Sequence, residues 1–306
     1  MKVGFLLTAA LPLRVLSICV PVYQYDARPL VRAVLAQAEA QGVEIELLLR
    51  DDHSPDGHLE DEHAALASEL GFAFRQNASN LGRSATRNLL AREAQGTWLL
   101  FLDADGLPER DDFLVRYAEA AASGHADVFC GGTSYAAEPP ADRRLRLRYR
   151  YGVEREARTS AERARHPYAA FSSFNFLIRR AAFARVGFDE ALRGYGHEDT
   201  LFGHRLREAG FGVSHLDNPL RHLGLEPRET FLAKSAEAVR QLAELRQRFP
   251  TLPARLADGY AKVSGAAPLL RRAEPLLQRL LEAGVDDLRL FDAWRLARYA
   301  KAARQG

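Results

Sequence analysis

Two aspartates follow directly on an apolar run, in Leu99-Leu100-Phe101-Leu102-Asp103-Ala104-Asp105. In an extended segment, side chains two residues apart point to the same side, and two close carboxylates repel each other unless a cation lies between them. Hard oxygen ligands favour Mg²⁺ or Mn²⁺. The segment therefore predicts a metal site with Asp103 and Asp105 as ligands, which could bridge a diphosphate. A solvated turn is the alternative, since aspartate is common in turns.

Two further segments carry groups that could bind a nucleotide. Asp51 and Asp52 end another strand-like run, although an Asx turn or a helix cap explains the same residues. Asn80 precedes an expected helix that would present Arg83 and Arg87 one turn apart on one face. Two guanidiniums there could bind a diphosphate. The alternative is an exposed basic start of a helix.

A fourth segment, Gly194-Tyr195-Gly196-His197-Glu198-Asp199, opens a further expected helix. Its two acids would lie at the positive end of the helix dipole, which is expected to keep an aspartate ionised at neutral pH. An ionised carboxylate can take a proton from a sugar hydroxyl, so Asp199 and Glu198 are the candidate catalytic residues. Plain N-capping is the alternative. The histidines and acids of 53–63 resemble metal ligands by type, but their spacing favours an exposed acidic helix.

These segments need a scaffold, and the hydrophobic pattern predicts one. Short apolar runs separated by helical patterns indicate an α/β fold with a mostly parallel sheet covered on both faces. Ligands bind beyond the carboxyl ends of such strands, where residues 21–26, 51–56 and 103–106 are expected. The strands are expected at 15–20, 43–49, 72–74, 98–102, 127–130, 171–178 and 212–216, and the helices at 29–40, 59–70, 84–94, 111–122 and 199–209.

Two regions depart from this alternation. The Arg-rich stretch 139–166 is predicted to be an inserted, partly helical surface segment. From residue 229 onward the chain is predicted to be helical and broken by Pro250, Pro253, Pro268 and Pro275. Leucines and arginines alternate in 269–281, which is compatible with a helix at a membrane surface, and packing onto the rest of the chain is the alternative.

The composition limits the classes of protein to consider. The chain has 306 residues, of which 47% are hydrophobic and 27% are charged, so a packed core is expected. A net charge of +2 is too small to indicate a nucleic-acid partner. Cys19 and Cys130 show neither metal nor redox spacing, and no apolar run approaches the ~20 residues of a membrane span. A cytoplasmic location is therefore expected, with peripheral contact at the inner face of a membrane as a further expectation.

Together and in this order, the motifs resemble the family 2 glycosyltransferases of the GT-A fold. The resemblance covers roughly residues 14–222. It rests on Val20-Pro21-Val22-Tyr23, Asp51-Asp52-His53-Ser54, the segment 80–88 with its Asn-Leu-Gly and Ala-Thr-Arg-Asn runs, the Asp-Ala-Asp triplet and the Glu198-Asp199 pair. The second motif more often reads Asp-Asp-Gly-Ser, so His53 is a departure that bears on the loop geometry.

The resemblance implies a role for each matched residue. Tyr23 and Asp52 would hold the nucleotide base, and Asp51 and Arg87 would support the nucleotide. We also place Pro21, Asn80, Arg83 and Asp103 among the substrate-binding residues. Asp103 and Asp105 would hold Mn²⁺ or Mg²⁺ with the diphosphate, and Asp199 would be the base of an inverting transfer. Several GT-A enzymes place a histidine after the last strand of the catalytic domain. His222 is therefore expected to complete the metal site, with His215 as its competitor.

The resulting hypothesis is a metal-dependent glycosyltransferase that moves a sugar from a nucleotide-sugar donor, with UDP as the default nucleotide, onto a glycan, lipid-linked or other hydroxyl acceptor. Residues 1–227 would form the GT-A catalytic domain and 228–306 a helical extension. A nucleotidyltransferase of related fold is one alternative, but it would open with a glycine-rich loop where Pro21 stands. A non-catalytic nucleotide- or carbohydrate-binding protein is the other, and it would not require Asp199.

Overall fold

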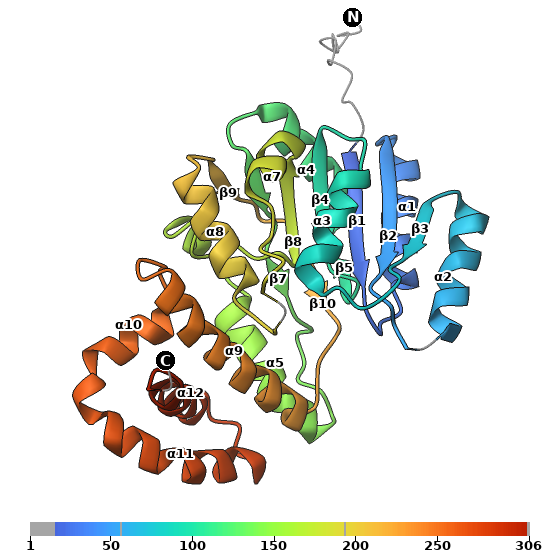
Figure 1. Cartoon of the computed structure of the whole chain (residues 1–306). Helices are drawn as coiled ribbons and strands as arrows, with labels where there is room; N and C mark the ends of the chain where they lie inside the picture. The colour runs from blue at the N-terminus through green and yellow to red at the C-terminus, as the bar shows by residue number, and fades with distance from the viewer. Residues whose placement is uncertain (1–15, 56, 193, 305–306) are drawn as a thin grey trace, which may run out of the picture.

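A seven-stranded sheet forms the centre of the protein in the computed structural model, which describes residues 16–55, 57–192 and 194–304 (Figure 1). Its strand order is β3-β2-β1-β4-β8-β6-β9. Strand β8 runs antiparallel to both β4 and β6, and the other neighbouring strands are parallel. The mostly parallel sheet is thus confirmed. Its strands are β1 (Leu16–Val22), β2 (Ile45–Asp51), β3 (Ala73–Gln76), β4 (Trp98–Leu102), β6 (Val128–Cys130), β8 (Asn175–Arg179) and β9 (Val213–His215).

Helices cover both faces of this sheet, which explains why its strands are apolar without alternation. All five residues of β4 are buried: Leu100 and Leu102 pack into one core, and Leu99 and Phe101 into the other. The first core also holds α1 (Arg28–Gln41) and α4 (Phe113–Ser123). The second holds α3 (Arg83–Glu93), α7 (Arg180–Val186) and α8 (Glu198–Glu208). Helix α2 (Gly57–Leu70) packs beside β3 at the edge.

A small three-stranded sheet, in the order β5-β10-β7, was not expected from the sequence. Its strands are β5 (Gly106–Pro108), β7 (Thr133–Ser134) and β10 (Leu220–His222). Strands of two or three residues are too short to show a hydrophobic period. The register places His222 opposite Gly106, so this sheet brings His222 next to the segment that follows β4.

The segment after β4 is not extended, contrary to expectation. Residues 103–106 form a tight turn, in which the Gly106 N–H donates to the Asp103 carbonyl at 3.0 Å. Asp103 and Asp105 therefore do not share one side of a strand. The reason is that the chain must reverse here to form β5, which pairs antiparallel with β10.

The prediction of a surface segment at 139–166 was wrong in part. The segment is helical, with η1 (Arg143–Leu145), α5 (Arg146–Tyr151), the π-helix η2 (Gly152–Glu156) and α6 (Ser160–Ala164). However, Leu147, Arg148, Tyr149 and Arg163 are buried. The first three are covered because α5 packs against α9 and α12 from the end of the chain, and Arg163 because α6 packs against β9.

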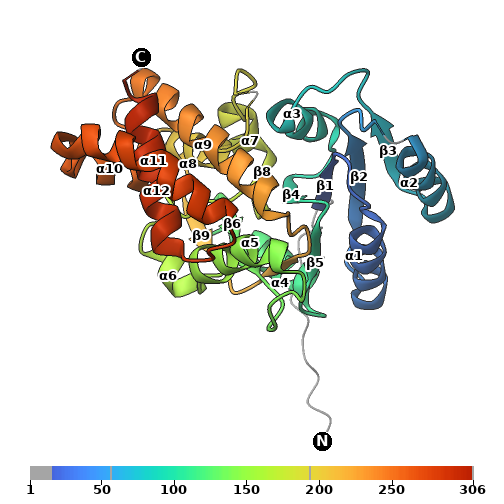
Figure 2. The ribbon, with the colours of Figure 1, turned by 90° about the horizontal axis from the view of Figure 1, so that it is seen from below.

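The end of the chain forms a helical unit with its own apolar core (Figure 2). It comprises α9 (Arg228–Arg248), α10 (Arg255–Lys262), η3 (Ser264–Ala266), α11 (Ala267–Glu282) and α12 (Leu288–Ala302). The core joins Phe231, Leu281, Phe291 and Trp294 to Leu147 of α5. Pro275 lies inside α11 and does not end it, contrary to expectation. None of the helices in the described ranges is both long and apolar enough to cross a membrane.

Candidate functional site

A cavity of about 500 Å³ lies between the sheet and the C-terminal helices. That volume is in the range of small-molecule sites. The cavity brings together six of the predicted site residues, from four separate segments: Arg83, Arg87, Asp103, Glu198, Asp199 and His222. The rule that ligands bind beyond the carboxyl ends of the strands therefore located the site.

At the wall of this cavity, an ion pair links Arg87 of α3 to Asp103, which follows β4. The Arg87 Nη2 atom donates to Asp103 Oδ1 at 2.6 Å. The Arg87 side chain is buried, and its Nε and Nη1 atoms have no hydrogen-bond partner in the described part of the chain. A buried guanidinium with unused donors favours a further anionic partner. The pair thus suits a ligand that carries phosphate.

Asp105 faces His222 across the small sheet. Asp105 Oδ2 lies 3.4 Å from His222 Nε2. Burial, and then the charge of Asp103, raises the pKa of Asp105 to about 6. Burial, and then the charge of Arg148, lowers the pKa of His222 to about 4. The imidazole is therefore neutral at pH 7 and able to bind a metal ion.

These groups do not yet form a complete metal site. In the residues that the structure describes, no three His, Cys, Asp or Glu side chains are grouped closely enough to hold an ion. The ion pair holds the Asp103 carboxylate on the side of the turn where Arg87 lies. His215 is not available as a substitute, because its ring nitrogens lie 2.8 Å from Arg163 Nη1 and 3.0 Å from the Pro167 carbonyl.

Asp199 lies in the first turn of α8, after the left-handed residue His197 (φ 64°). Its Oδ1 atom is buried without a hydrogen-bond partner among the described residues. Burial, and then the charge of Glu198, raises the pKa of Asp199 to about 6, although hydrogen bonds with Ser173 oppose this shift. Burial thus opposes the ionisation that the helix dipole is expected to favour. At pH 7 the carboxylate is still largely ionised.

Glu198 lies beside Arg83 on the same wall, with 3.5 Å between Glu198 Oε1 and Arg83 Nη1. The Arg83 guanidinium also stacks 4.6 Å from the centre of the Tyr195 ring. These contacts connect the start of α3 to the loop before α8.

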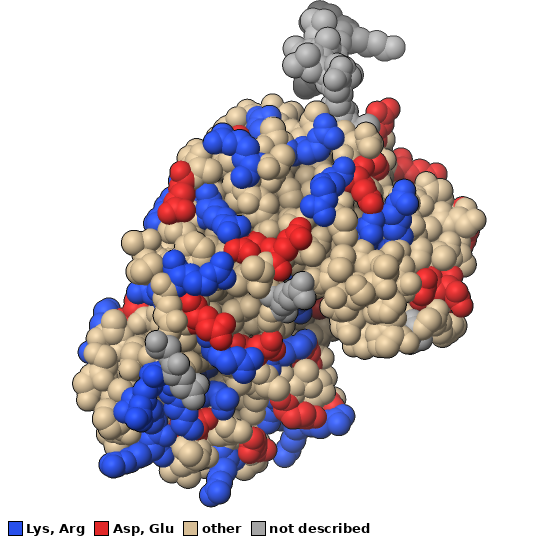
Figure 3. Space-filling view, viewed as in Figure 1, with Lys and Arg blue, Asp and Glu red and all other residues tan. Residues whose placement is uncertain are grey.

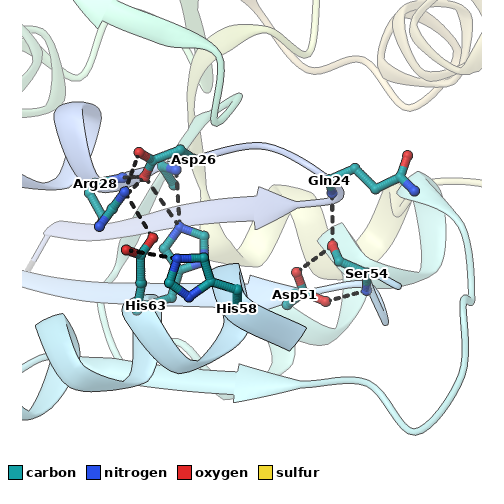
Figure 4. Close-up of polar contacts among 9 residues, drawn as sticks. Gln24, Asp26, Arg28, Asp51, Ser54, His58 and His63 are labelled. Carbon is teal, nitrogen blue, oxygen red and sulfur yellow. Dashed lines mark hydrogen bonds and ion pairs between the residues drawn. The ribbon is translucent and has the colours of Figure 1, made fainter. Parts of the chain in front are cut away.

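The aspartates after β2 brace two loops (Figure 4 shows the first). Asp51 accepts hydrogen bonds from the Ser54 N–H at 2.6 Å and from the Ser54 hydroxyl at 2.7 Å, and the Gln24 N–H donates to Ser54 Oγ. Asp52 accepts from Asn77 Nδ2 and from the N–H groups of Leu81 and Gly82, each at 2.8 Å. Both carboxylates thus have structural partners, and their contact with a nucleotide stays a prediction.

The other predicted residues of this edge lie outside the cavity lining. Tyr23 is 49% exposed, Asn80 is exposed and Pro21 is partly exposed at the end of β1. Nearby, the expectation of an exposed acidic helix was wrong for His63. This side chain is fully buried and accepts from the Ala27 N–H at 3.1 Å, because α2 packs it against the loop that carries Asp26 (Figure 4).

Several residues of the site were missed in the sequence. Arg148 lies 3.5 Å from His222 Nε2 and pairs with Glu156 at 3.0 Å. A β-carbon on Gly224 would lie 2.2 Å from Asp105 Oδ2, so a side chain at this position would force the carboxylate to move. Gly196 packs in the same way on Ala238 of α9, where a β-carbon would approach to 2.9 Å. The glycines were visible in the sequence, but their neighbours are distant along the chain.

With the geometry in view, the comparison with known proteins is direct. The family described as glycosyl transferase family 2 matches residues 17–187, more than half of the chain. The chain belongs to glycosyltransferase family 2. A second family, described as the N-terminal domain of galactosyltransferase, matches residues 155–225. No curated protein sequence matches this family 2 chain significantly.

Solved structures support the GT-A fold of this family 2 protein. Residues 1–349 of S. aureus TarS align with a TM-score of 0.51 and 18% identity, over 95% of this chain and 90% of TarS. The same part of TarS in complex with UDP-GlcNAc aligns with a TM-score of 0.50 and 18% identity, over 95% and 91%. The Pyrobaculum calidifontis mannosyltransferase PcManGT, in complex with GDP-Man and Mn²⁺, aligns with a TM-score of 0.60 and 15% identity, over 95% and 86%.

Proposed function

We propose that this protein transfers a hexosyl group from a UDP-linked sugar to an acceptor hydroxyl, with Mn²⁺ or Mg²⁺ and with inversion at the anomeric carbon. The observation that carries the proposal is one cavity lined by a buried guanidinium with unused donors, Arg87, which pairs with Asp103, and by a buried carboxylate, Asp199. Membership of family 2 supports the reaction class.

Asp199 is the proposed base. Its unpartnered Oδ1 atom can accept the proton of the acceptor hydroxyl. The hydroxyl oxygen then bonds to the anomeric carbon on the face opposite the diphosphate, and the bond from that carbon to the diphosphate oxygen breaks. A direct displacement of this kind inverts the configuration. Glu198 is the proposed auxiliary residue, because its charge raises the pKa of Asp199.

Asp103, Asp105 and His222 are the proposed ligands of a divalent cation, which would bind together with the diphosphate of the donor. Burial, and then the charge of Asp103, raises the pKa of Asp105, and a cation bound beside it would favour the ionised carboxylate. His222 Nδ1 is buried without a partner in the described ranges, and Nε2 faces Asp105. When bound, the cation would stabilise the charge of the departing diphosphate. PcManGT, with GDP-Man and Mn²⁺, supports this cofactor.

The donor is proposed to carry UDP, which Tyr23, Asp51 and Asp52 would bind beside the cavity. TarS supports the choice, since its structures contain UDP and UDP-GlcNAc, whereas PcManGT contains GDP-Man. The alternatives explain less. A non-catalytic binding protein leaves the buried Asp199 without a role, and a nucleotidyltransferase leaves Pro21 in place of a glycine-rich loop.

A thermal-shift panel tests the donor. In the presence of Mn²⁺, UDP-linked sugars should raise the melting temperature, because a ligand at ~100 times its dissociation constant adds ~2.7 kcal/mol of stability. GDP-mannose should have little effect, and chelation of the metal should weaken the UDP effect. A stabilisation by GDP-mannose alone would replace UDP in the proposal. If no nucleotide sugar shifts the melt with metal present, the proposed function is wrong.

We also propose that α11 contacts an anionic membrane surface. Leu269, Leu276 and Leu280 are 68%, 63% and 39% exposed on this helix, with the exposed Arg272 and Arg279 between them. Figure 3 shows Lys and Arg side chains gathered over the lower left of the molecule, where Figure 1 places the C-terminal helices. Apolar residues with interleaved arginines suit a bilayer interface of negative charge.

Co-sedimentation with liposomes tests this contact. The protein should bind vesicles that contain an anionic lipid at low salt, and Leu276→Glu should weaken binding by about tenfold, because a buried leucine contributes ~1.5–3 kcal/mol. Leu70→Glu, at an exposed leucine of α2, is the matched control. If the wild type stays in the supernatant, or if both variants behave alike, α11 is not a membrane contact.

A further inference from the structure

The segment 139–166 and the C-terminal helices supply most of the arginines that line the cavity. The whole lining holds eight arginines and four carboxylates. Arg155, Arg158, Arg255 and Arg295 come from η2, the loop after it, α10 and α12. These elements belong to the segment 139–166 and to the C-terminal helices. Most of both regions lies outside the motifs that are proposed to bind the donor.

Most of this positive charge is not compensated within the protein. Arg155 pairs with Asp292 at 3.1 Å. In the described ranges, Arg158, Arg255 and Arg295 form no ion pair with a carboxylate. The Arg295 side chain packs on aromatic rings, with its guanidinium 5.6 Å from the centre of the Phe291 ring. An arginine held in this way presents its donors in a fixed geometry.

Among these arginines, Arg295 acts on the segment that carries the proposed base. The pKa of His197, two residues before Asp199, is lowered to about 4 by burial and then by the charge of Arg295. His197, Asp199 and Arg295 all line the cavity. An acceptor hydroxyl placed at Asp199 would therefore have the rest of its molecule within reach of Arg295.

The donor does not account for this charge. Its diphosphate has Arg83, Arg87 and the proposed cation at the ends of the strands. A cleft with low-dielectric walls and one sign of charge concentrates ligands of the opposite sign, and guanidiniums bind phosphate and carboxylate groups in bidentate geometry. Relying on the proposed function, we infer that the acceptor is anionic and carries a phosphate or carboxylate group near the hydroxyl that is glycosylated, bound by Arg158, Arg255 and Arg295.

Three small probes that share a vicinal diol test the inference: glycerol 3-phosphate, glyceric acid and glycerol. Each is titrated calorimetrically into the protein saturated with UDP and Mn²⁺, so that the donor site is closed to the phosphate. The two anions should bind, with an affinity that falls as salt rises, and glycerol should not. The anion that binds with the higher affinity shows whether the acceptor carries a phosphate or a carboxylate group.

Arg255→Gln and Arg295→Gln should each raise the dissociation constant of the anion by about tenfold, since each removes charge-assisted hydrogen bonds. Arg289→Gln is the matched control, because this exposed arginine lies on α12 outside the cavity lining. The melting temperature of each variant shows whether it is folded. If Arg295→Gln is unstable, Arg255→Gln still tests the inference, because Arg255 is an exposed residue.

Equal anion affinities in all three variants, or binding of glycerol as tight as that of the anions, would overturn the inference. So would a wild-type protein that binds UDP and neither anion. The two proposals fail separately, because UDP affinity is measured first. If UDP itself does not bind, the proposed function fails, and the same titration without nucleotide decides whether the arginines form an anion site.

Discussion

Replacing Asp199 with asparagine is expected to lower turnover by ~10² to 10⁴ while donor binding survives. The amide keeps the shape of the carboxylate and cannot accept the proton of the acceptor hydroxyl. Single-turnover transfer from a UDP-linked sugar, together with the melting shift caused by UDP, separates the two effects. Asp61→Asn, at an exposed aspartate of α2, is the control and should behave as wild type.

The pH dependence of turnover is an independent test of the role of Asp199. Because the pKa of Asp199 is raised to about 6, the base is protonated below this pH and turnover should fall there by about tenfold per pH unit. The pKa of Asp105 is also raised to about 6, so the profile is measured at saturating Mn²⁺, where the residual activity of Asp199→Asn should lack this limb. Near-normal turnover in the asparagine variant would show that another group takes the proton.

The motifs that hold the candidate site residues could be recognised in the sequence because each lies within a few residues of a strand end or a helix start. Apolar strands such as β4 mark where the chain crosses the core, and parallel strands bring their carboxyl ends to one edge. This reasoning placed Arg87, Asp103 and Asp199, which are far apart in sequence, around one cavity. Their chemical roles stay predictions until the variants are measured.

The wall opposite these motifs could not be predicted. The sequence around Arg148 and Arg295 does not indicate that they line a cavity, since an arginine in a helix of mixed polarity is expected to be exposed to solvent. They line the cavity because α5 and α12 pack on α9. In the same way, the burial that raises the pKa of Asp199 depends on the whole assembly around α8. Properties set by long-range packing are not visible in a short motif.

The C-terminal helices also contact the loop that precedes Asp199, the proposed base. Glu237 of α9 accepts a hydrogen bond from the Tyr195 N–H at 3.0 Å, and Gly196 packs against Ala238. These contacts hold the segment just before Asp199. The division into residues 1–227 and 228–306 therefore separates two parts that share one site, and we infer that the first part alone would position Asp199 poorly.

His222→Ala is expected to weaken Mn²⁺ binding by roughly 10- to 100-fold, measured calorimetrically with UDP present. The imidazole is neutral at pH 7, because its pKa is lowered to about 4, and its Nε2 atom already faces Asp105. Mn²⁺ accepts imidazole together with carboxylate oxygens. Removing His222 should therefore leave the ion with the two aspartates and the diphosphate alone.

His215→Ala is the matched control for this prediction, and it should leave the affinity for Mn²⁺ unchanged. His215 interacts with Arg163 and with the Pro167 carbonyl, so its loss is expected to lower the melting temperature without touching the metal. Unchanged Mn²⁺ affinity in His222→Ala would remove this histidine from the proposed site. Loss of affinity in His215→Ala alone would transfer the role to His215, and would require Arg163 to release it when the ion binds.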